Sequence, residues 1–404
     1  MRLRVGRTVA GTLAALYMVF LAGYLIQRPD YDWDDFPYLA IALSYGGTAG
    51  GLLHEQAYGI MRDTVPKATM DSLTGIVTSE SLAATSSTTT IGDPVFRQEM
   101  ARDSEKFLAQ LPFFSVKPIY PALMAVGHLC GLDLMTSGFL VSVLAYVGIG
   151  IVLYLWFSEW MPSFVALSIM ALLVINPWLV IIARRLGPDI LSIFALMLGG
   201  YLAFGYDDYN SPQKLAGRPL AASIVFLVAI AIRPENALYA LLLVLYLWIG
   251  RSLTITPAAF LMVGAFVIYF GITMIFGHYG WHTLFYFSFV NKSAALSDGQ
   301  PHLGWLDYMN FYLGRLDRIL MGQGELPIFA LVGLGGLLLK FGLKPLRDKY
   351  VHLILLSGII GAIRIIVLPT EAYRALLPCY MFVTIAFIEA CTVCKGTVKM
   401  TVDT

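Results

Sequence analysis

Four aspartates lie directly after the first apolar run of the chain, in "RPDYDWDDFPY": Asp30, Asp32, Asp34 and Asp35. A carboxylate at the edge of a site can act as a general base and take a proton from a hydroxyl group. The D-x-D spacing of Asp32 and Asp34 could alternatively bind a divalent cation through oxygen ligands, although a lone D-x-D is a weak signal. We do not favour a cation and expect no required cofactor or metal site, because cationic side chains elsewhere in the chain could neutralise an anion.

Three short segments later in the chain each combine arginine with an acid: "ARRLGPD", "IRPEN" and "TEAYRALLP". A guanidinium group can hold a phosphate through two parallel hydrogen bonds. Together with a general base, such cations could transfer a group from a phosphate to a hydroxyl and stabilise the charge left on the phosphate. The residues assigned to phosphate binding are Arg184, Arg185, Arg233, Arg374 and, from the first long loop, Lys117. Those assigned to catalysis are Asp34, Asp35 and Asp189, and those assigned a supporting role are Asp32, Glu235, Glu371 and Arg364.

The composition predicts that these residues lie in an all-α polytopic membrane protein. Hydrophobic residues make up 58% of the 404 positions, charged residues 13%, and the mean hydropathy is +0.73. A soluble domain would carry about 25% charged residues. The net charge of +1 gives no reason to expect a nucleic-acid partner, so the expected environment is a lipid bilayer.

Ten apolar stretches are interpreted as transmembrane helices, since a bilayer core of about 30 Å requires about 20 helical residues. The fifth and sixth stretches are short and separated only by "RPEN", so residues 219–250 form either two spans or a re-entrant hairpin. The predicted spans are 8–26, 134–157, 162–183, 190–206, 219–232, 237–250, 257–276, 326–339, 350–368 and 375–394.

Basic residues predict the orientation of these spans. Arg2, Arg4 and Arg7 precede the first span and place the N-terminus in the cytoplasm. An even number of spans returns the C-terminus to the same side. The first span is longer than a signal-peptide core and lacks an A-x-A-like cleavage site, so we expect it to be retained. The acids and arginines of interest then share one extracytoplasmic surface, which we expect to be the periplasmic face of a bacterial inner membrane.

We expect residues 1–404 to form a single transmembrane domain. Two long extracytoplasmic segments belong to it. In the first, residues 27–133, a Ser/Thr-rich stretch is expected to be flexible, and Asp93 followed by Pro94 predicts the start of an amphipathic surface helix that continues to about Leu111. The stretch "YPALMAVGHLCGL" predicts a further surface or partly inserted helix. The second segment, residues 278–325, is rich in aromatic residues, as is typical of an interfacial belt or a sugar-stacking surface.

Arg364 lies inside the ninth predicted span, close to its outer end. An unpaired charge at the centre of a membrane costs about 2.5 to 3.5 kcal/mol on insertion scales. We therefore expect this side chain to face an interior cavity. Snorkelling of the guanidinium to the headgroups is the alternative.

Four segments make the chain similar to the GT-C superfamily of polyprenyl-phosphate-dependent glycosyltransferases, which includes lipid A aminoarabinose transferases and protein O-mannosyltransferases. "DDFPYLAIA" resembles the acidic pair of the first outer loop, which implies that Asp34 is the catalytic base. "FFSVKPIYPALMAVGHLCGL" resembles the lysine-proline motif and places Lys117 in it. "RRLGPDILS" resembles the second outer acid, which is Asp189 here, and "EAYRALLP" resembles the arginine motif that contacts the donor phosphate, which is Arg374 here.

The resemblance implies a fold of transmembrane helices with juxtamembrane helices in the first outer loop. It also implies a sugar donor carried on a polyprenyl monophosphate, an extracytoplasmic glycan, lipid or protein acceptor, and inversion at the anomeric carbon. The family's acidic pair is commonly Asp-Glu, whereas this chain has Asp34-Asp35, so the resemblance does not decide between the two aspartates. Acceptor recognition is expected in the two long outer loops.

Two other functions fit the same charged outer surface. A transporter or flippase of a lipid-linked substrate would also use arginines at the headgroup level, although the chain lacks a convincing second copy of "RPEN" or "DWDD". A glycan ligase or polymerase would use a diphosphate-linked oligosaccharide in place of a monophosphate. We expect a glycosyltransferase.

Overall fold

The computed structural model describes residues 2–76, 94–205, 218–241, 255–277, 279–280, 283, 285–286, 304–323, 349–367 and 373–400. Over these residues the chain is helical, and they contain no β-strand. The fold class predicted from composition, all-α, is therefore confirmed for this part of the protein.

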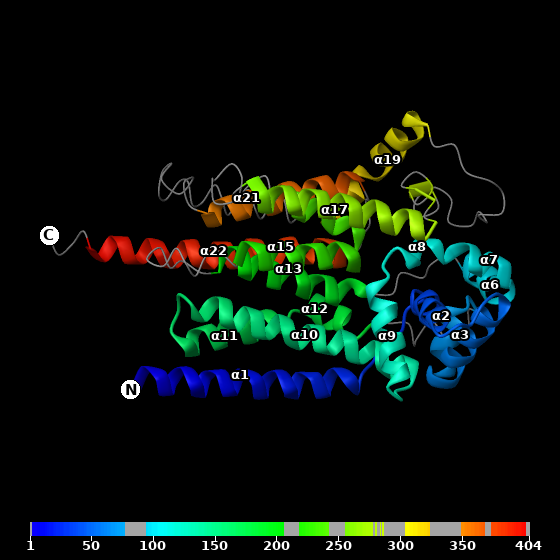
Figure 1. Cartoon of the computed structure of the whole chain (residues 1–404), viewed down its shortest axis with the longest axis horizontal. Helices are drawn as coiled ribbons and strands as arrows, with labels where there is room; N and C mark the ends of the chain where they lie inside the picture. Colours follow the sequence, from blue (N-terminus) through cyan, green and yellow to red (C-terminus); the bar gives the residue numbers. More distant parts are fainter. Residues whose placement is uncertain are drawn as a thin grey trace.

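The long helices lie side by side along the longest axis of the molecule (Figure 1). The two termini lie at one end of this bundle, and the helices of the first long loop gather at the other end. The bundle consists of α1 (Arg2–Ile26), α10 (Leu134–Ser158), α11 (Ser163–Val174), α12 (Pro177–Ala183), α13 (Pro188–Phe204), α15 (Arg218–Ile232), α17 (Ile255–Ile275), α21 (Lys349–Val367) and α22 (Tyr373–Met400).

Several of these helices are compatible with a lipid bilayer. Two described helices, Gly6–Ile26 and Leu134–Ser158, are long and apolar enough to cross a membrane, and a bent pair of helices adds a third candidate. In the remaining apolar helices, the apolar stretches whose side chains are described are 10 to 17 residues long. Ten spans are therefore not confirmed. Most of the predicted spans 237–250 and 326–339 lies outside the described residues.

The predicted span 162–183 contains a break, because the structure has two helices there with a bend of 68° between them, as in a broken span or a re-entrant loop. Asn176 accepts hydrogen bonds from the first backbone N–H groups of α12, and Pro177 cannot donate to the preceding turn. The hydroxyl of Tyr146 on α10 donates to the carbonyl of Val174 at 2.8 Å. Side chains therefore form hydrogen bonds with backbone groups on both sides of the break, which explains why the helix is interrupted within an apolar stretch.

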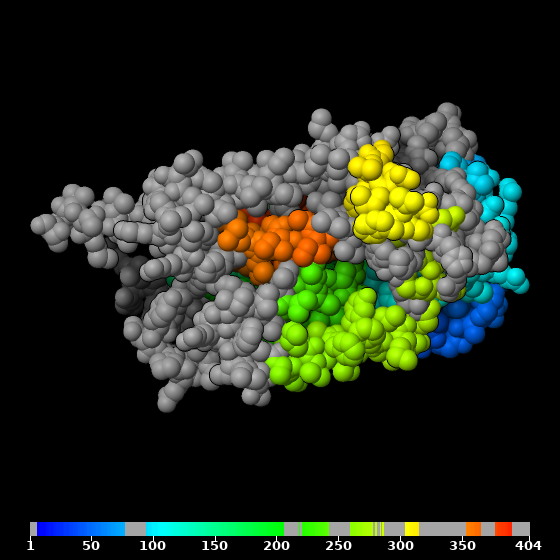
Figure 2. Space-filling model, turned by 90° about the horizontal axis from the view of Figure 1, so that it is seen from above, coloured from blue at the N-terminus to red at the C-terminus, as the bar shows by residue number. Residues whose placement is uncertain are grey.

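Large apolar side chains cover the outside of α1 and α17. Phe20 on α1 is 70% exposed and Met274 on α17 is 82% exposed. Figure 2 shows that α17, in yellow-green, lies along the surface of the molecule. Contiguous exposed apolar surface of this kind is expected where helices contact lipid.

The first long loop contains seven described helices that form a second apolar core. Its centre includes Phe36 stacked on Tyr58 at 4.2 Å between ring centroids, and Trp33 against Phe96 at 5.2 Å. The helices are α2 (Asp35–Tyr45), α3 (Gly51–Thr64), α4 (Lys67–Leu73), α6 (Pro94–Arg102), α7 (Ser104–Gln110), α8 (Pro112–Ser115) and α9 (Ile119–Leu129).

The helix predicted from Pro94 to Leu111 begins at Pro94 as expected, but it is interrupted. Asp103 is in an extended conformation, and its carboxylate accepts the first N–H groups of α7 at 3.0 and 3.1 Å. Because this N-cap starts a new helix, α6 and α7 form two separate elements. The predicted short helix after Tyr120 is present as α9, whereas residues 77–93 of the Ser/Thr-rich stretch lie outside the described residues.

The second long segment, 278–325, is described mainly in α19 (Trp305–Gln323). Phe285 is fully buried, and its ring lies 5.0 Å from that of Tyr308 and 5.3 Å from that of Phe311. Trp305 at the start of the helix is 72% exposed. Some of the aromatic residues of this segment are therefore held in a local cluster, and others face outward.

The arrangement of the termini and the first loop at opposite ends of the bundle predicts a labelling pattern. In a variant whose native cysteines are serine, cysteine at Ala49, in the exposed turn between α2 and α3, should react with a membrane-impermeant maleimide added to intact cells. Cysteine at Ser163, at the other end of the bundle, should react only after permeabilisation. Labelling of both positions from the same side would contradict the predicted topology.

Candidate active site

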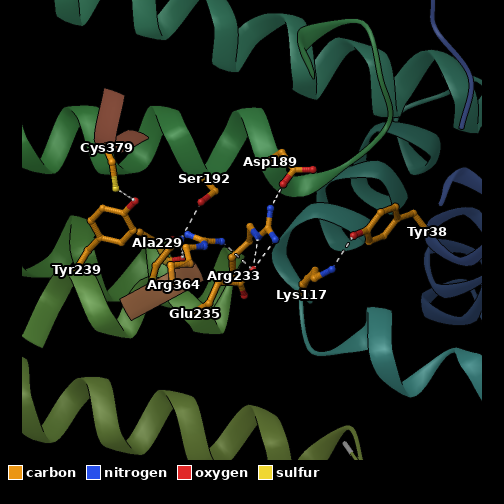
Figure 3. Close-up of polar contacts among 11 residues, drawn as sticks. Tyr38, Lys117, Asp189, Ser192, Ala229, Arg233, Glu235, Tyr239, Arg364 and Cys379 are labelled. Carbon is orange, nitrogen blue, oxygen red and sulfur yellow. Dashed lines mark hydrogen bonds and ion pairs between the residues drawn. The ribbon is translucent and has the colours of Figure 1, made fainter. Parts of the chain in front are cut away.

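Arg233 is the centre of a charged network at the end of the bundle opposite the termini (Figure 3). Its guanidinium forms ion pairs with Asp189 of α13 and with Glu235. The Nε–H donates to Oε1 of Glu235 at 2.7 Å. Side chains from two different turns of the chain therefore meet at one guanidinium.

The local sequence explains the position of Arg233. Pro234 cannot continue α15, so Arg233 is extended, with φ −147° and ψ 112°, and a 3-10 turn, η1 (Pro234–Asn236), follows. The buried Asn236 side chain donates to Ser192 Oγ of α13 at 2.8 Å and to the carbonyl of Ala229 at 2.7 Å. These bonds attach the "RPEN" turn to two helices and fix the direction of Arg233.

Asp189 is placed by the start of α13. Gly187 and Pro188 precede it, and Pro188 is in the first helical turn, where its missing N–H has no cost. A carboxylate in the first turn of a helix is stabilised by the positive end of the helix dipole. Asp189 is thus held as an anion next to Arg233.

Arg364 of α21 joins the network from inside the bundle. Its side chain is 9% exposed, and Nη2 lies 3.4 Å from Oε1 of Glu235. Nearby, the hydroxyl of Tyr239 lies 3.0 Å from Cys379 Sγ (Figure 3). The guanidinium therefore has an ionic partner in the "RPEN" turn, as the cost of an unpaired charge in lipid led us to expect. That it faces an interior cavity stays a prediction.

Lys117 connects the network to the first loop. Its ammonium donates to the hydroxyl of Tyr38 at 3.2 Å and lies 5.4 Å from the ring centre of Phe114. A Cβ atom added at Gly187 would lie 3.9 Å from the Tyr38 ring and 3.7 Å from Oδ2 of Asp189. Tyr38 on α2 is therefore a neighbour of both Lys117 and the turn that carries Asp189.

Arg185 has a different set of partners from those that the sequence analysis assigned. Its Nε donates to Asp30 at 2.7 Å and its Nη1 donates to Asp32 at 3.1 Å. The adjacent Arg184 bonds through Nε to the carbonyl of Arg28, and its own carbonyl accepts the N–H of Asp30 at 2.9 Å. These two arginines fasten the acid-rich segment to the turn between α12 and α13. Their predicted role in phosphate binding stays a prediction.

The remaining two aspartates of the acid-rich segment have contrasting environments. Asp34 is half-buried at the N-cap position of α2, and its carboxylate makes no capping hydrogen bond to that helix. Asp35 is fully buried, and its Oδ2 accepts the N–H of Asp32 at 2.9 Å. Burial, reinforced by the carboxylates of Asp32 and Asp34, raises the pKa of Asp35 well above its usual value, although the Asp32 N–H and Arg185 oppose this.

Arg97 on α6 is a charged neighbour of the acid-rich segment that the sequence analysis did not identify. It is 6% exposed and donates to the carbonyl of Ser72 at 3.1 Å. Burial lowers the pKa of Arg97, whereas Asp32 and Asp34 favour its charged form. Its proximity to these acids follows from the packing of Trp33 on Phe96, and no local sequence signal indicates that contact.

Two of the predicted site residues can be placed only in part. Arg374 lies in the first turn of α22, but its side chain is outside the described residues. Glu371 lies outside them entirely. Among the side chains that are described, no group of three or more His, Cys, Asp or Glu is arranged to hold a metal ion.

The environment of Glu235 predicts how it contributes to stability. Burial alone would raise the pKa of Glu235, but the charges of Arg233, Arg364 and Lys117 lower it below the usual value of 4.5. Its ion pairs should therefore stabilise the fold fully above pH 4.5, and this contribution should be lost as the pH falls below that value and the carboxylate is protonated.

Replacing Glu235 with glutamine should therefore destabilise the protein by about 3 kcal/mol near pH 7, because two buried guanidinium groups lose their shared partner. The difference in Tm between wild type and Glu235→Gln should be constant from pH 8 to about pH 5 and narrow at lower pH. A difference in Tm that does not depend on pH down to pH 3 would contradict the assigned ion pairs.

The described cluster can bind an anion. Lys117, Arg233 and Arg364 carry three positive charges, and the two carboxylates of Asp189 and Glu235 balance two of them. Asp34, on the helix that also carries Tyr38, supplies a candidate base. No protein-family model, curated protein or solved structure matches this chain.

Proposed function

We propose that this protein is an integral membrane glycosyltransferase of the GT-C type. It transfers a sugar from a polyprenyl monophosphate donor to a hydroxyl group of an extracytoplasmic glycan, lipid or protein. Asp34 is the general base, and the reaction inverts the anomeric carbon. The resemblance of the four sequence motifs and the arrangement of charges around Arg233 support this proposal.

One observation carries most of the weight. Asp189, Arg233, Glu235 and Arg364 come from three separate parts of the chain and form one connected cluster, and the charge of Lys117, from a fourth part, acts on Glu235. The cluster brings three cations from distant parts of the chain close together, which suits an anionic ligand.

The charge of these residues does not by itself select the donor. A sugar linked to a polyprenyl monophosphate is a phosphodiester with a single negative charge, whereas a diphosphate-linked sugar carries a further negative charge, for which Arg374 would be an additional cation. The monophosphate donor is preferred over the donor of a glycan ligase or polymerase because of the sequence resemblance.

The chemistry follows from this placement. Asp34 takes the proton of the acceptor hydroxyl as its oxygen forms the new bond to the anomeric carbon. The bond between that carbon and the phosphate oxygen breaks, and polyprenyl phosphate leaves with a second negative charge. Arg233 and Lys117 stabilise this new charge more strongly than they stabilise the donor, and a stronger interaction in the transition state is what accelerates a reaction.

Donor competition tests the proposal directly. Purified protein in detergent should consume a polyprenyl-phosphate sugar from a panel of hexose and pentose donors, in the presence of a cell-envelope extract as acceptor. The same sugars on a polyprenyl diphosphate should not be consumed. If only the diphosphate donors are consumed, the proposed monophosphate donor is wrong and the donor is a diphosphate-linked sugar.

A transporter or flippase is the second candidate, and the buried ion pair between Arg364 and Glu235 is the observation that favours it. Ionisable residues inside apolar helices often mark a transport pathway. Sugar transfer in detergent, where no compartments exist, separates the two functions. Movement of a fluorescent polyprenyl phosphate between the leaflets of proteoliposomes, without sugar transfer, would support the transporter.

A further inference from the structure

The two adjacent acids of the "DWDD" segment have separate roles, and the geometry points to a role for Asp35 that the sequence motif does not assign. We propose that Asp35 is a positioning residue that holds the acid-rich turn from inside the protein, so that Asp34 alone takes the proton of the acceptor. The assignment of the proton to Asp34 rests on the proposed glycosyltransferase function. The positioning role of Asp35 does not, because it follows from burial and hydrogen bonding.

Asp35 cannot reach an acceptor in the structure. Its side chain has no exposed surface, and it is the first residue of α2, with Phe36 and Pro37 buried directly after it. A general base must come within hydrogen-bond distance of the proton that it removes. Asp34, one residue earlier, is half-buried and lies at the end of the helix.

The hydrogen bonds of Asp35 close the turn that precedes α2. Its Oδ2 accepts the N–H of Asp32 at 2.9 Å, and its own N–H donates to the carbonyl of Asp32 at 3.1 Å. This reciprocal pair fixes the backbone on both sides of Trp33 and Asp34. Because Asp32 is held in this way, its carboxylate can bind Arg185 at 3.1 Å.

The groups around Asp35 favour its uncharged form. Asp32 and Asp34 belong to the same turn, Arg185 approaches from the turn between α12 and α13, and the hydroxyl groups of Tyr31 and Tyr120 also interact with it. Two adjacent ionised carboxylates would repel each other, and a fully buried carboxylate is costly to ionise. An uncharged Asp35 removes this repulsion from the turn that carries Asp34.

The test compares Asp35→Asn, Asp35→Ala and Asp34→Asn in the full-length protein. Asparagine at position 35 keeps an oxygen that can accept the Asp32 N–H but cannot act as a base. We expect Asp35→Asn to keep kcat within about tenfold of wild type and to leave the acid limb of the pH profile in place, whereas Asp34→Asn should lose about 10²- to 10⁴-fold. Asp35→Ala should lose more than Asp35→Asn, mainly in kcat, because Asp34 is no longer held.

Hydrogen–deuterium exchange supplies a readout that does not depend on activity. Amide exchange over residues 30–38 should be faster in Asp35→Ala than in wild type, and it should be close to wild type in Asp35→Asn and Asp34→Asn. Unchanged exchange in Asp35→Ala would overturn the positioning role.

Equal losses of activity in Asp35→Asn and Asp34→Asn, or full activity in Asp34→Asn, would overturn the division of roles. If the wild type transfers no sugar from any donor while exchange responds as expected, the proposed function fails and the positioning role of Asp35 stands.

Discussion

Asp34→Asn is expected to lower the rate of sugar transfer by about 10²- to 10⁴-fold, the range typical for loss of a general base. The amide has a similar shape but cannot accept the acceptor's proton. Donor binding should be unchanged, because the carboxylate at position 34 contacts the acceptor and not the phosphate. Single-turnover transfer with a bound polyprenyl-phosphate sugar measures the chemical step, and isothermal titration with the same donor measures binding.

A matched control is available on the same loop. Asp63 is an exposed carboxylate in the last turn of α3, outside the charged cluster, so Asp63→Asn should transfer sugar at the wild-type rate. If Asp34→Asn folds, binds donor and turns over at the wild-type rate, Asp34 is not the base. Equal losses in both variants would indicate a general effect of charge on the loop.

Arg233→Gln is expected to reduce kcat/KM for the donor by about 10²- to 10³-fold, comparable to the removal of a donor that stabilises a developing anion. Arg233 is central to the cluster, since it contacts both Asp189 and Glu235. Without it, the leaving phosphate loses a bidentate partner. Steady-state kinetics with a varied donor concentration measures the loss.

Two further variants distinguish the loss of the guanidinium group from a general effect on folding. Arg233→Lys keeps the positive charge but not the planar pair of donors, so it should recover only part of the activity. Arg62→Gln removes an exposed arginine on α3 and should behave as wild type. Because Arg233→Gln also removes one ion-pair partner from each of two carboxylates, its Tm must be measured. A folded Arg233→Gln with normal donor kinetics would rule out the assigned role.

A local signal in the sequence predicted where one helix begins. Pro94 begins α6 as expected, whereas the helix predicted from residue 190 begins earlier, with Pro188 in the first turn of α13. Asn176 and Asp103, where two predicted helices are interrupted, are residue types that favour the start of a new helix. The sequence did not predict these breaks, because the hydrophobic pattern continues across them and a hydropathy average smooths over a break of two residues.

Pairing between distant residues could not be predicted. Arg185 contacts Asp30, and Arg364 contacts Glu235, across more than a hundred positions of sequence. The sequence indicated that all of these charges share one surface, but the choice of partner depends on how the helices are rotated and packed. The contrast between Asp34 and Asp35 has the same origin, since identical neighbouring residues differ only in the face of the turn that they occupy.

The central claim is that the acid-rich turn and the Arg233 cluster form one pocket for a lipid phosphate and its sugar. The most direct measurement is a cryo-EM structure of Asp34→Asn bound to a polyprenyl-phosphate sugar. The account predicts phosphate density between Lys117 and Arg233, with the anomeric carbon of the sugar facing position 34. Phosphate density at another surface, or a sugar that lies away from position 34, would contradict it.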